Sequence, residues 1–349
     1  MIEDTPTARL ISYKTVALMN DTSRVGIITI VNSIQHVFCI IAVAVNATLL
    51  VLIQTKSRKE LGNYRHLMTT FCIFSVLFTV LEDVIEPSVQ MKEGSFAIFI
   101  LTQGYRSKTT ALIVLCIYAA VFSGLLGVLA LHFAFRYRFF LIWPPVLCMP
   151  LIMYFCFCFL ILGPTPEKTS HIQEKMWFEF NLTTDEYTYI GAHYFTLDND
   201  GNRVYNYLDC LSMFFVSLYT AGIGSLLIFC GYHTYAKLLE KNDRDVTKAA
   251  LIKQEKQKQL FRALMAQTII PMVVVYTPCA VLYFSPLLGV SDVGFYTNLI
   301  LLLLSVYSVL DPICAIYFIE DYHRFWSSSR VFNAVDDTYV SERSQPNEA

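Results

Sequence analysis

Residues 75–90 read SVLFTVLEDVIEPSVQ, an apolar run that ends in three carboxylates, Glu82, Asp83 and Glu86. A carboxylate inside a bilayer is unfavourable by at least a few kcal/mol, so an acid there indicates a function or an interhelical bond. The alternative is that the membrane ends here. A helix needs about 20 residues to cross a bilayer core of about 30 Å, so a span that begins near Leu67 places Glu86 at the outer interface. Asp83 then reaches the headgroups, and Glu82, about a turn deeper, is the acid expected to face the bundle interior.

The composition of the 349-residue chain indicates that the bilayer is its solvent. Hydrophobic residues make up 55% of the chain and charged residues 15%, against about 25% charged in a typical soluble domain. Mean hydropathy is +0.49. The net charge of −2 gives no field that favours nucleic acid. Most of the ten cysteines lie in apolar runs, where free cysteine behaves as a small hydrophobe, and no spacing suggests a metal site. We therefore expect membrane lipids as partners, and neither a metal nor a cofactor.

Seven apolar runs are long enough to cross a membrane as helices. They cover residues 25–53, 67–86, 109–135, 139–162, 207–235, 257–285 and 295–319. The sequence therefore predicts an all-α membrane protein, a seven-transmembrane helix bundle over residues 25–319.

The loops fix the direction in which the spans run. Lysine and arginine gather in the first, second and third loops expected inside, and in the tail, as the positive-inside rule requires of cytoplasmic segments. The N-terminus, residues 1–24, is then outside and the tail, 320–349, inside. The sequons at Asn20 and Asn181 both fall outside and are candidate glycosylation sites. Residues 163–206 form a long outer loop, and 236–256 form the main cytoplasmic loop.

Seven spans permit a receptor, a transporter or a channel. Transporters tend to contain internal repeats, and channels contain a filter loop or rings of charge; neither is visible in the sequence. An enzyme would place a cluster of acids and histidines near one face, and the only candidate cluster, LEDVIEP, has no histidine in its span. A receptor remains favoured, with a ligand-gated channel or small-molecule transporter as the alternative, and no enzymatic activity is expected.

Four motifs in order resemble those of one family. They are LGNYRHLM (61–68), HFAFRY (132–137), QLFRALMAQTIIPMVVVYTP (259–278) and LDPICAIYFIEDYHRF (310–325). Together they resemble the signatures of the nematode seven-transmembrane chemoreceptors of the Str class, also called serpentine receptor class r, over nearly the whole chain. This resemblance implies a G-protein-coupled receptor for an odorant or another small environmental molecule, sited on the cilia of chemosensory neurons. It implies a heterotrimeric G protein as the partner.

The resemblance also implies roles for particular residues. Arg136 and Tyr137 take the place of the Asp-Arg-Tyr triplet of rhodopsin-like receptors, although Phe135 replaces the acid. Asp311 and Pro312 take the place of the Asn-Pro of the seventh span. By the same parallel, a disulfide between Cys116 and Cys210 would tie the long outer loop to the third span, and two free thiols are the alternative.

We expect the ligand in the outer half of the bundle, beneath the long loop, because small-molecule pockets are concave and mostly apolar. Candidate lining residues there are aromatic, and for each the alternative is plain helix packing: Tyr118, Phe122, Phe214, Phe215, Tyr219, Tyr276, Tyr283, Phe284 and, at the rim, Tyr296. Glu82 is a further candidate, either as a ligand contact or as an interhelical bond. Pro271 and Pro278 are candidate hinges in the sixth span.

Overall fold

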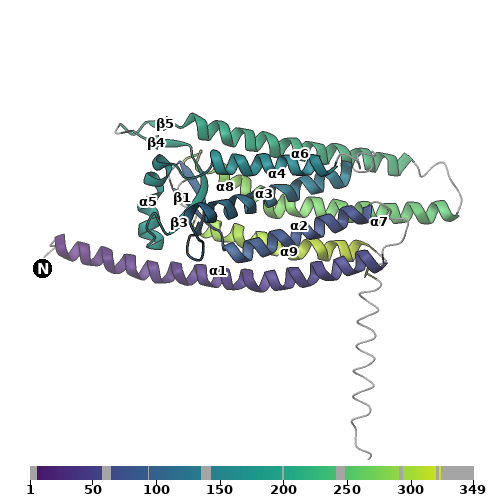
Figure 1. The fold of residues 1–349 in the computed structure, drawn as a ribbon, viewed down its shortest axis with the longest axis horizontal. Coiled ribbons are helices and arrows are strands. Elements are labelled where there is room, and N and C mark those ends of the chain that lie inside the picture. Colours follow the sequence, from purple (N-terminus) through teal and green to yellow (C-terminus); the bar gives the residue numbers. More distant parts are fainter. Residues whose placement is uncertain are drawn as a thin grey trace, which may run out of the picture.

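The computed structural model describes residues 6–56, 64–92, 94–134, 143–198, 200–240, 248–290, 294–319 and 322–323. Within them, the bundle is made of helices that run side by side (Figure 1). These are α1 (Pro6–Lys56), α2 (Tyr64–Ile85), α3 (Lys108–Ala134), α4 (Trp143–Leu160), α6 (Tyr207–Glu240), α7 (Lys248–Pro271) continued by η4 (Met272–Tyr276) and α8 (Thr277–Phe284), and α9 (Gly294–Phe318).

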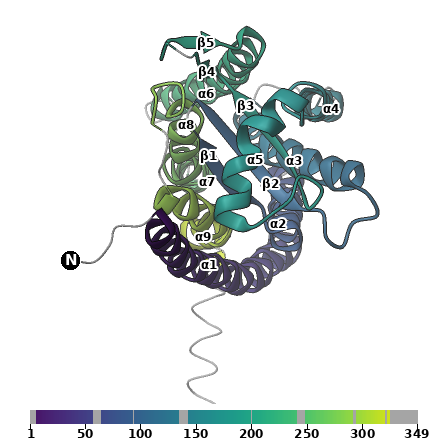
Figure 2. The same cartoon turned by 90° about the vertical axis from the view of Figure 1, so that its left-hand side faces the viewer.

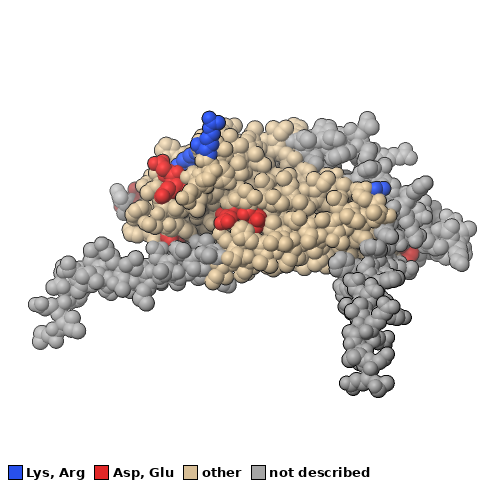
Figure 3. Space-filling model, turned by 60° about the horizontal axis from the view of Figure 1, so that its bottom comes forward, with Lys and Arg blue, Asp and Glu red and all other residues tan. Residues whose placement is uncertain are grey.

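The seven predicted spans are all present as helices in this bundle. By length and composition, the described residues contain six helices that can cross a membrane. The seventh is α4, of 18 residues, whose apolar part is shorter. The flank of the molecule in Figure 3 is nearly free of charge, as a surface facing lipid tails must be. The seven-helix bundle predicted from the sequence is confirmed.

Two of the helices differ from simple spans. Helix α1 begins at Pro6, well before the predicted start of the first span, and its N-terminal end projects past the bundle (Figure 1). In the sixth span, Pro271 is followed by five residues of π-helix, and Thr277 Oγ1 donates to the carbonyl of Met272 at 2.7 Å. Proline removes one backbone hydrogen bond and its ring displaces the preceding turn, and for Pro278 in the first turn of α8 that preceding turn is the π-helical segment.

The outer loops fold into a small sheet, which the sequence analysis did not predict. Strands β1 (Ser88–Lys92) and β2 (Ser95–Leu101) form a hairpin between α2 and α3, with Gly94 in the left-handed region at φ +69°. Strand β3 (Tyr187–His193) from the long outer loop pairs antiparallel with β2, and Ile98 lies opposite Ile190. We call the sheet β1–β2–β3 the roof, because it lies across the outer end of the bundle (Figure 2).

The rest of the long outer loop covers the roof. Helix α5 (Pro166–Phe180) has Thr165 as its N-cap, whose hydroxyl accepts from the Lys168 backbone N–H. It packs Ile172 and Met176 against β2 and β3 residues Phe99 and Tyr187. A two-stranded ribbon of β4 (Phe195–Leu197) and β5 (Arg203–Tyr205) stands beside it at the start of α6 (Figure 2).

The core divides into an outer and a cytoplasmic part. The larger cluster joins the inner face of the roof, including Phe96 and Ile190, to α2, α3, α4, α6, α8 and α9. A separate cluster packs the cytoplasmic ends of α1, α2, α7 and α9 around Leu52, Ile53 and Tyr322. The roof is therefore continuous with the core of the outer half, and any site beneath it is enclosed by both.

Candidate ligand-binding site

A cavity lies directly beneath the roof in the outer half of the bundle. Its volume is about 60 Å³, several times the roughly 10–15 Å³ that one water molecule needs. It is lined by Pro87, Val89, Phe96, Ile98, Tyr118, Ala119, Phe122, Tyr154, Cys158, Leu162, Ile190, Gly191, Met213, Val216, Cys279, Leu282, Tyr283, Ile300, Leu301 and Leu304. The roof thus contributes a wall that no single span could provide.

The lining is apolar with a few hydrogen-bonding groups. None of the residues that line it carries a charge. The hydroxyls of Tyr118, Tyr154 and Tyr283 form no hydrogen bond within the described part of the chain, so they are free to donate into the cavity. Two thiols, of Cys158 and Cys279, complete the polar groups. Such a lining suits a small neutral molecule with hydrogen-bond acceptors.

Three of the six ligand-binding residues predicted from the sequence line this cavity. They are Tyr118, Phe122 and Tyr283. The other two aromatic residues lie behind this layer: the Tyr276 ring packs 5.5 Å from that of Phe122, and the Tyr219 hydroxyl accepts from Ser123 at 3.4 Å. Tyr276 and Tyr219 therefore support the wall from behind.

Phe214, Phe215 and Phe284 were candidates for the lining, with plain helix packing as the alternative, and they do not line this cavity. Their side chains are exposed on the outer surface of the bundle, by 60%, 53% and 42%. The fifth-span residues that reach the cavity are instead Met213 and Val216, three apart and hence on one face of α6. Tyr296 lies outside the residues whose side chains the structure describes.

Glu82 is buried but does not line the cavity. It is only 4% exposed, and its Oε1 has no hydrogen-bond partner in the described part of the chain. The Ser305 hydroxyl of α9 lies within reach of its carboxyl, and Tyr118 and Cys279 are close neighbours. Of the two roles left open by the sequence, this position favours an interhelical contact between α2 and α9, one layer behind the cavity wall.

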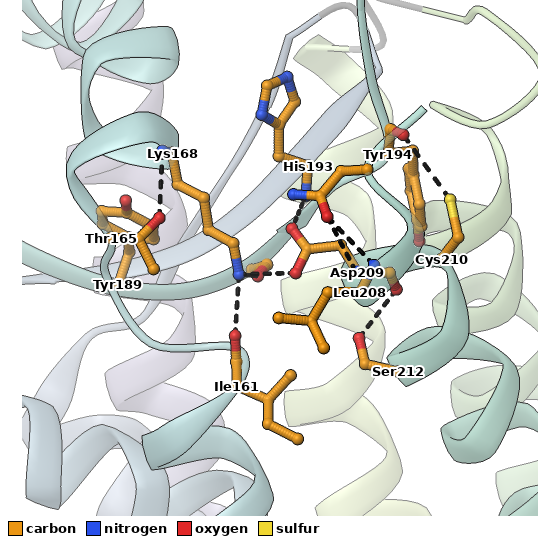
Figure 4. Close-up of polar contacts among 12 residues, drawn as sticks. Ile161, Thr165, Lys168, Tyr189, His193, Tyr194, Leu208, Asp209, Cys210 and Ser212 are labelled. Atoms are coloured by element: carbon orange, nitrogen blue, oxygen red, sulfur yellow. Dashed lines mark hydrogen bonds and ion pairs between the residues drawn. The ribbon is translucent and has the colours of Figure 1, made fainter. Parts of the chain in front are cut away.

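A buried ion pair anchors the roof to the bundle (Figure 4). Lys168 Nζ of α5 lies 2.9 Å from Asp209 Oδ1 at the start of α6, and both side chains are almost fully buried. Lys168 Nζ also donates to the Ile161 carbonyl at the end of α4, at 2.9 Å. The second carboxylate oxygen of Asp209 accepts the His193 backbone N–H at 2.8 Å. One pair thus joins α4, α5, β3 and α6. The pair was not predicted from the sequence, because Lys168 lies in the long outer loop and Asp209 lies 41 positions further on, in the first turn of α6.

Beside this pair lies a buried histidine. His193 is 2% exposed, and its ring stacks on that of His171 at 4.1 Å. Burial lowers the pKa of His193 below its ordinary value, opposed in part by Glu167 and Asp209 and assisted by the Lys168 charge. The imidazole is therefore neutral at neutral pH.

In the cytoplasmic half, Asp311 forms a contact between α7 and α9. Asp311 is 1% exposed, and its Oδ2 accepts from Gln267 Nε2 at 3.5 Å. Nearby, Asn46 of α1 donates to the carbonyls of Ala42 and Ser308, at 2.9 and 3.3 Å. Pro312 lies inside α9. Arg136 and Tyr137 lie outside the described residues.

Cys116 and Cys210, for which the resemblance suggested a disulfide and two free thiols were the alternative, are both free thiols in the structure. Cys116 is fully buried within α3, in the same core cluster as Cys158 of α4. The Cys210 thiol instead donates to the carbonyl of Tyr194 at 3.6 Å. The Lys168–Asp209 ion pair, and not a disulfide, connects the long outer loop to the bundle.

Comparison with known proteins places this architecture in a family. The family model described as "Serpentine type 7TM GPCR chemoreceptor Str" matches residues 31–326. "Serpentine receptor class r-10" of Caenorhabditis elegans is 28% identical over 85% of this chain and 90% of its own length. The protein of the same name from Caenorhabditis briggsae is 26% identical over 90% and 96%. "G-protein coupled receptor str-217" of Caenorhabditis elegans is 26% identical over 83% and 87%.

The fold is shared with a solved receptor. Squid rhodopsin superposes with a TM-score of 0.54 over 92% of this chain and 93% of its own, at 10% identity. At this identity the likeness concerns the fold alone, a seven-helix bundle of the G-protein-coupled receptor type. Taken together with the family match over most of its length, the chain belongs to the Str family of serpentine seven-transmembrane chemoreceptors.

Proposed function

We propose that this receptor binds a small, neutral environmental molecule in the cavity beneath the roof and activates a heterotrimeric G protein at its cytoplasmic face. The observation that carries the proposal is the cavity itself, in whose apolar lining no described residue is charged and three tyrosine hydroxyls are free to donate. We further propose the sensory cilium as its location and glycosylation at Asn20 and Asn181.

The size and chemistry of the cavity define the ligand class. A volume of about 60 Å³ suits a molecule of few non-hydrogen atoms. A charged ligand would lose its hydration without an opposite charge in the lining to replace it, which is strongly unfavourable. Carbonyl, ester or ether oxygens would accept from Tyr118, Tyr154 and Tyr283, so volatile ketones, aldehydes and esters are the class we propose.

The cytoplasmic half would carry the response to the G protein. The contact between Asp311 and Gln267 joins the two segments whose relative movement would open that face. It lies next to Pro312 inside α9 and close to the π-helical turn after Pro271. Pro278 is a second proposed hinge, and Arg136 with Tyr137 a proposed G-protein contact. A ligand shifts this equilibrium only by its difference in affinity for the two conformations, and couplings of about 1–3 kcal/mol are ordinary.

The test is nucleotide exchange on a co-expressed Gα protein, recorded together with membrane current. Cells expressing the chain would be exposed to a panel of small ketones, aldehydes and esters, with small amines and carboxylic acids as charged controls. We expect ligand-dependent exchange with a neutral compound and none with the charged ones. Current or uptake evoked without exchange would establish the alternative, a ligand-gated channel or a transporter.

A further inference from the structure

The outer ends of α1 and α2 are joined by a small polar clamp, made of Asn32, His36, Asp83 and Glu86. Asn32 Nδ2 donates to Glu86 Oε2 at 2.8 Å. His36 Nδ1 lies 2.6 Å from Asp83 Oδ1, and His36 Nε2 lies 3.4 Å from Glu86 Oε1. The side chains of His36 and Glu86 are each 47% exposed. On the flank that carries α1, Figure 3 shows an acidic patch in an otherwise uncharged surface.

The backbone of Glu86 is in an unusual conformation. Its φ is +43°, in the left-handed region of backbone conformation that residues other than glycine and asparagine rarely adopt. Its N–H closes the last turn of α2 by donating to the Glu82 carbonyl at 3.1 Å. A left-handed residue at a helix end is normally glycine. The interactions of the Glu86 side chain with α1 give a reason for a glutamate at this position.

The residues that follow Glu86 form part of the cavity wall. Pro87 and Val89 both line the cavity, and Val89 lies in β1, an edge strand of the roof. Because proline fixes its own φ, the direction of the chain beyond Pro87 is set largely by the conformation of Glu86. A side-chain clamp on Glu86 therefore acts on the wall residues Pro87 and Val89, which follow it directly in the chain.

The geometry of His36 requires a proton for the full clamp. A neutral imidazole carries one N–H, so only one of its nitrogens can donate. Here both ring nitrogens face carboxylate oxygens, an arrangement that the doubly protonated ring satisfies. Asp83 and Glu86 are the charged groups of the described part that act on this ring, with the buried Glu82 next along α2. Loss of the proton would turn one of the two contacts into a repulsion between lone pairs.

We propose that Asn32 and protonated His36 hold Glu86 in its left-handed conformation and thereby position Pro87 and Val89 in the wall of the cavity. Glu86 is then a positioning residue, and external pH acts on the cavity through His36. The inference deepens the proposed function, since the cavity is the proposed ligand site. Its test measures how accessible the thiols of the cavity wall are and needs no ligand. The clamp can therefore be refuted while the proposed receptor function holds, and the receptor function can be refuted while the clamp holds.

The cavity contains its own reporters, the thiols of Cys158 and Cys279. The full-length receptor in detergent would be treated with methyl methanethiosulfonate, and peptide mass spectrometry would give the labelling rate of each thiol relative to that of the exposed Cys156 of α4. We expect Glu86→Gly to raise the relative rate roughly threefold to tenfold, in line with the loss of partly exposed charged hydrogen bonds. Glycine accepts the backbone conformation without strain, so a purely conformational role for residue 86 predicts an unchanged rate. Glu255→Gln, an exposed acid on α7, is the matched control.

The pH dependence distinguishes the clamp from general packing. His36→Lys keeps a positive charge between about pH 6 and about pH 9, whereas an ordinary imidazole loses its charge in that range. Dividing the wild-type rate by that of His36→Lys at each pH removes the intrinsic titration of the thiols. We expect this ratio to rise with pH. A flat ratio, or equal labelling of Cys158 and Cys279 in wild type and Glu86→Gly, would overturn the proposal.

Discussion

The three carboxylates at the end of α2 have three different environments. Glu82 is buried between α2 and α9, while Asp83 and Glu86 are partly exposed and face His36 of α1. The depth of each acid along the span, at about 1.5 Å per residue, separated Glu82 from the other two in the sequence, whereas the i, i+4 spacing that put Glu82 and Glu86 on one face was misleading. It could not supply the partner of the exposed pair, because His36 lies about 50 residues earlier, on another helix.

At the Lys168–Asp209 pair, we expect a large loss of stability from removing the lysine. Lys168→Met leaves Asp209 buried without its counter-charge, which typically destabilises a protein by about 3–5 kcal/mol. The measurement is the thermal unfolding midpoint of purified receptor. The double variant Lys168→Met/Asp209→Leu should recover part of the loss, because neither charge of the buried pair then remains. A single variant as stable as wild type would contradict the anchoring role.

Among the cavity tyrosines, we expect Tyr154→Phe and Tyr283→Phe to weaken the response to an active ketone or ester. Each substitution removes one donor without changing the shape of the wall, and a net hydrogen bond contributes about 0.5–1.5 kcal/mol, or roughly twofold to tenfold in half-maximal concentration. Nucleotide exchange gives the measurement. Tyr317→Phe, on the exposed face of α9, is the control expected to match wild type. Unchanged potency in both cavity variants would remove the hydroxyls from ligand recognition.

At the scale of elements, the helices were predictable and the roof was not. Runs of about 20 apolar residues allow few structures other than a helix, because every backbone polar group must be satisfied within the span. Strand Ser95–Leu101 forms a local hairpin with Ser88–Lys92, but its other partner, Tyr187–His193, lies far along the chain and pairs with it only after the bundle has brought the two loops together. Such non-local pairing leaves little signal in a single short segment.

Gly191 tests how closely β3 must pack on β2. A Cβ at this position would lie 2.2 Å from the Phe96 carbonyl oxygen and 2.9 Å from Ala97 Cα, both of them backbone atoms that cannot rotate away. We expect Gly191→Ala to distort the roof and to lower surface expression and ligand response together. Gly222→Ala on α6, where nothing lies within 4 Å, is the matched control and should be neutral. Normal expression and response of Gly191→Ala would show that the roof is not part of the site.

The roof should also loosen in acid through His193. Burial lowers the pKa of this histidine below its ordinary 6.5, so the unfolded segment binds a proton that the folded roof excludes. Its contribution to stability is therefore complete above about pH 6.5 and is lost as the pH falls toward the lowered pKa. We expect smaller amide-exchange protection factors for β3 at about pH 5.5 than at about pH 7.5. His193→Asn should reduce that difference, and equal protection at both pH values in wild type would refute the idea.

At the scale of the whole molecule, the long outer loop, the roof and the N-terminal end of α1 gather at one end of the bundle (Figure 1). Asn181 is exposed at this end, as the left-handed C-cap of α5. If this end is outside the cell, the Asn181 sequon is available for glycosylation. Asn181→Gln should then remove one step in the electrophoretic shift produced by glycosidase treatment, and Asn20→Gln a second. A wild-type receptor without any shift would contradict glycosylation at both sites.

Composition and hydropathy alone determined the solvent, the number of helices and their order, because a bilayer leaves a chain few choices once its apolar runs are long enough. The ordered motifs determined the family. Tertiary structure decided which residues face the cavity, since in α6 it turned Met213 and Val216 toward the cavity and left Phe214 and Phe215 exposed on the surface. It also decided the roof, its Lys168–Asp209 anchor and the clamp on Glu86. These depend on groups distant in sequence that meet only when the bundle is assembled, and no local pattern of residues encodes such a meeting.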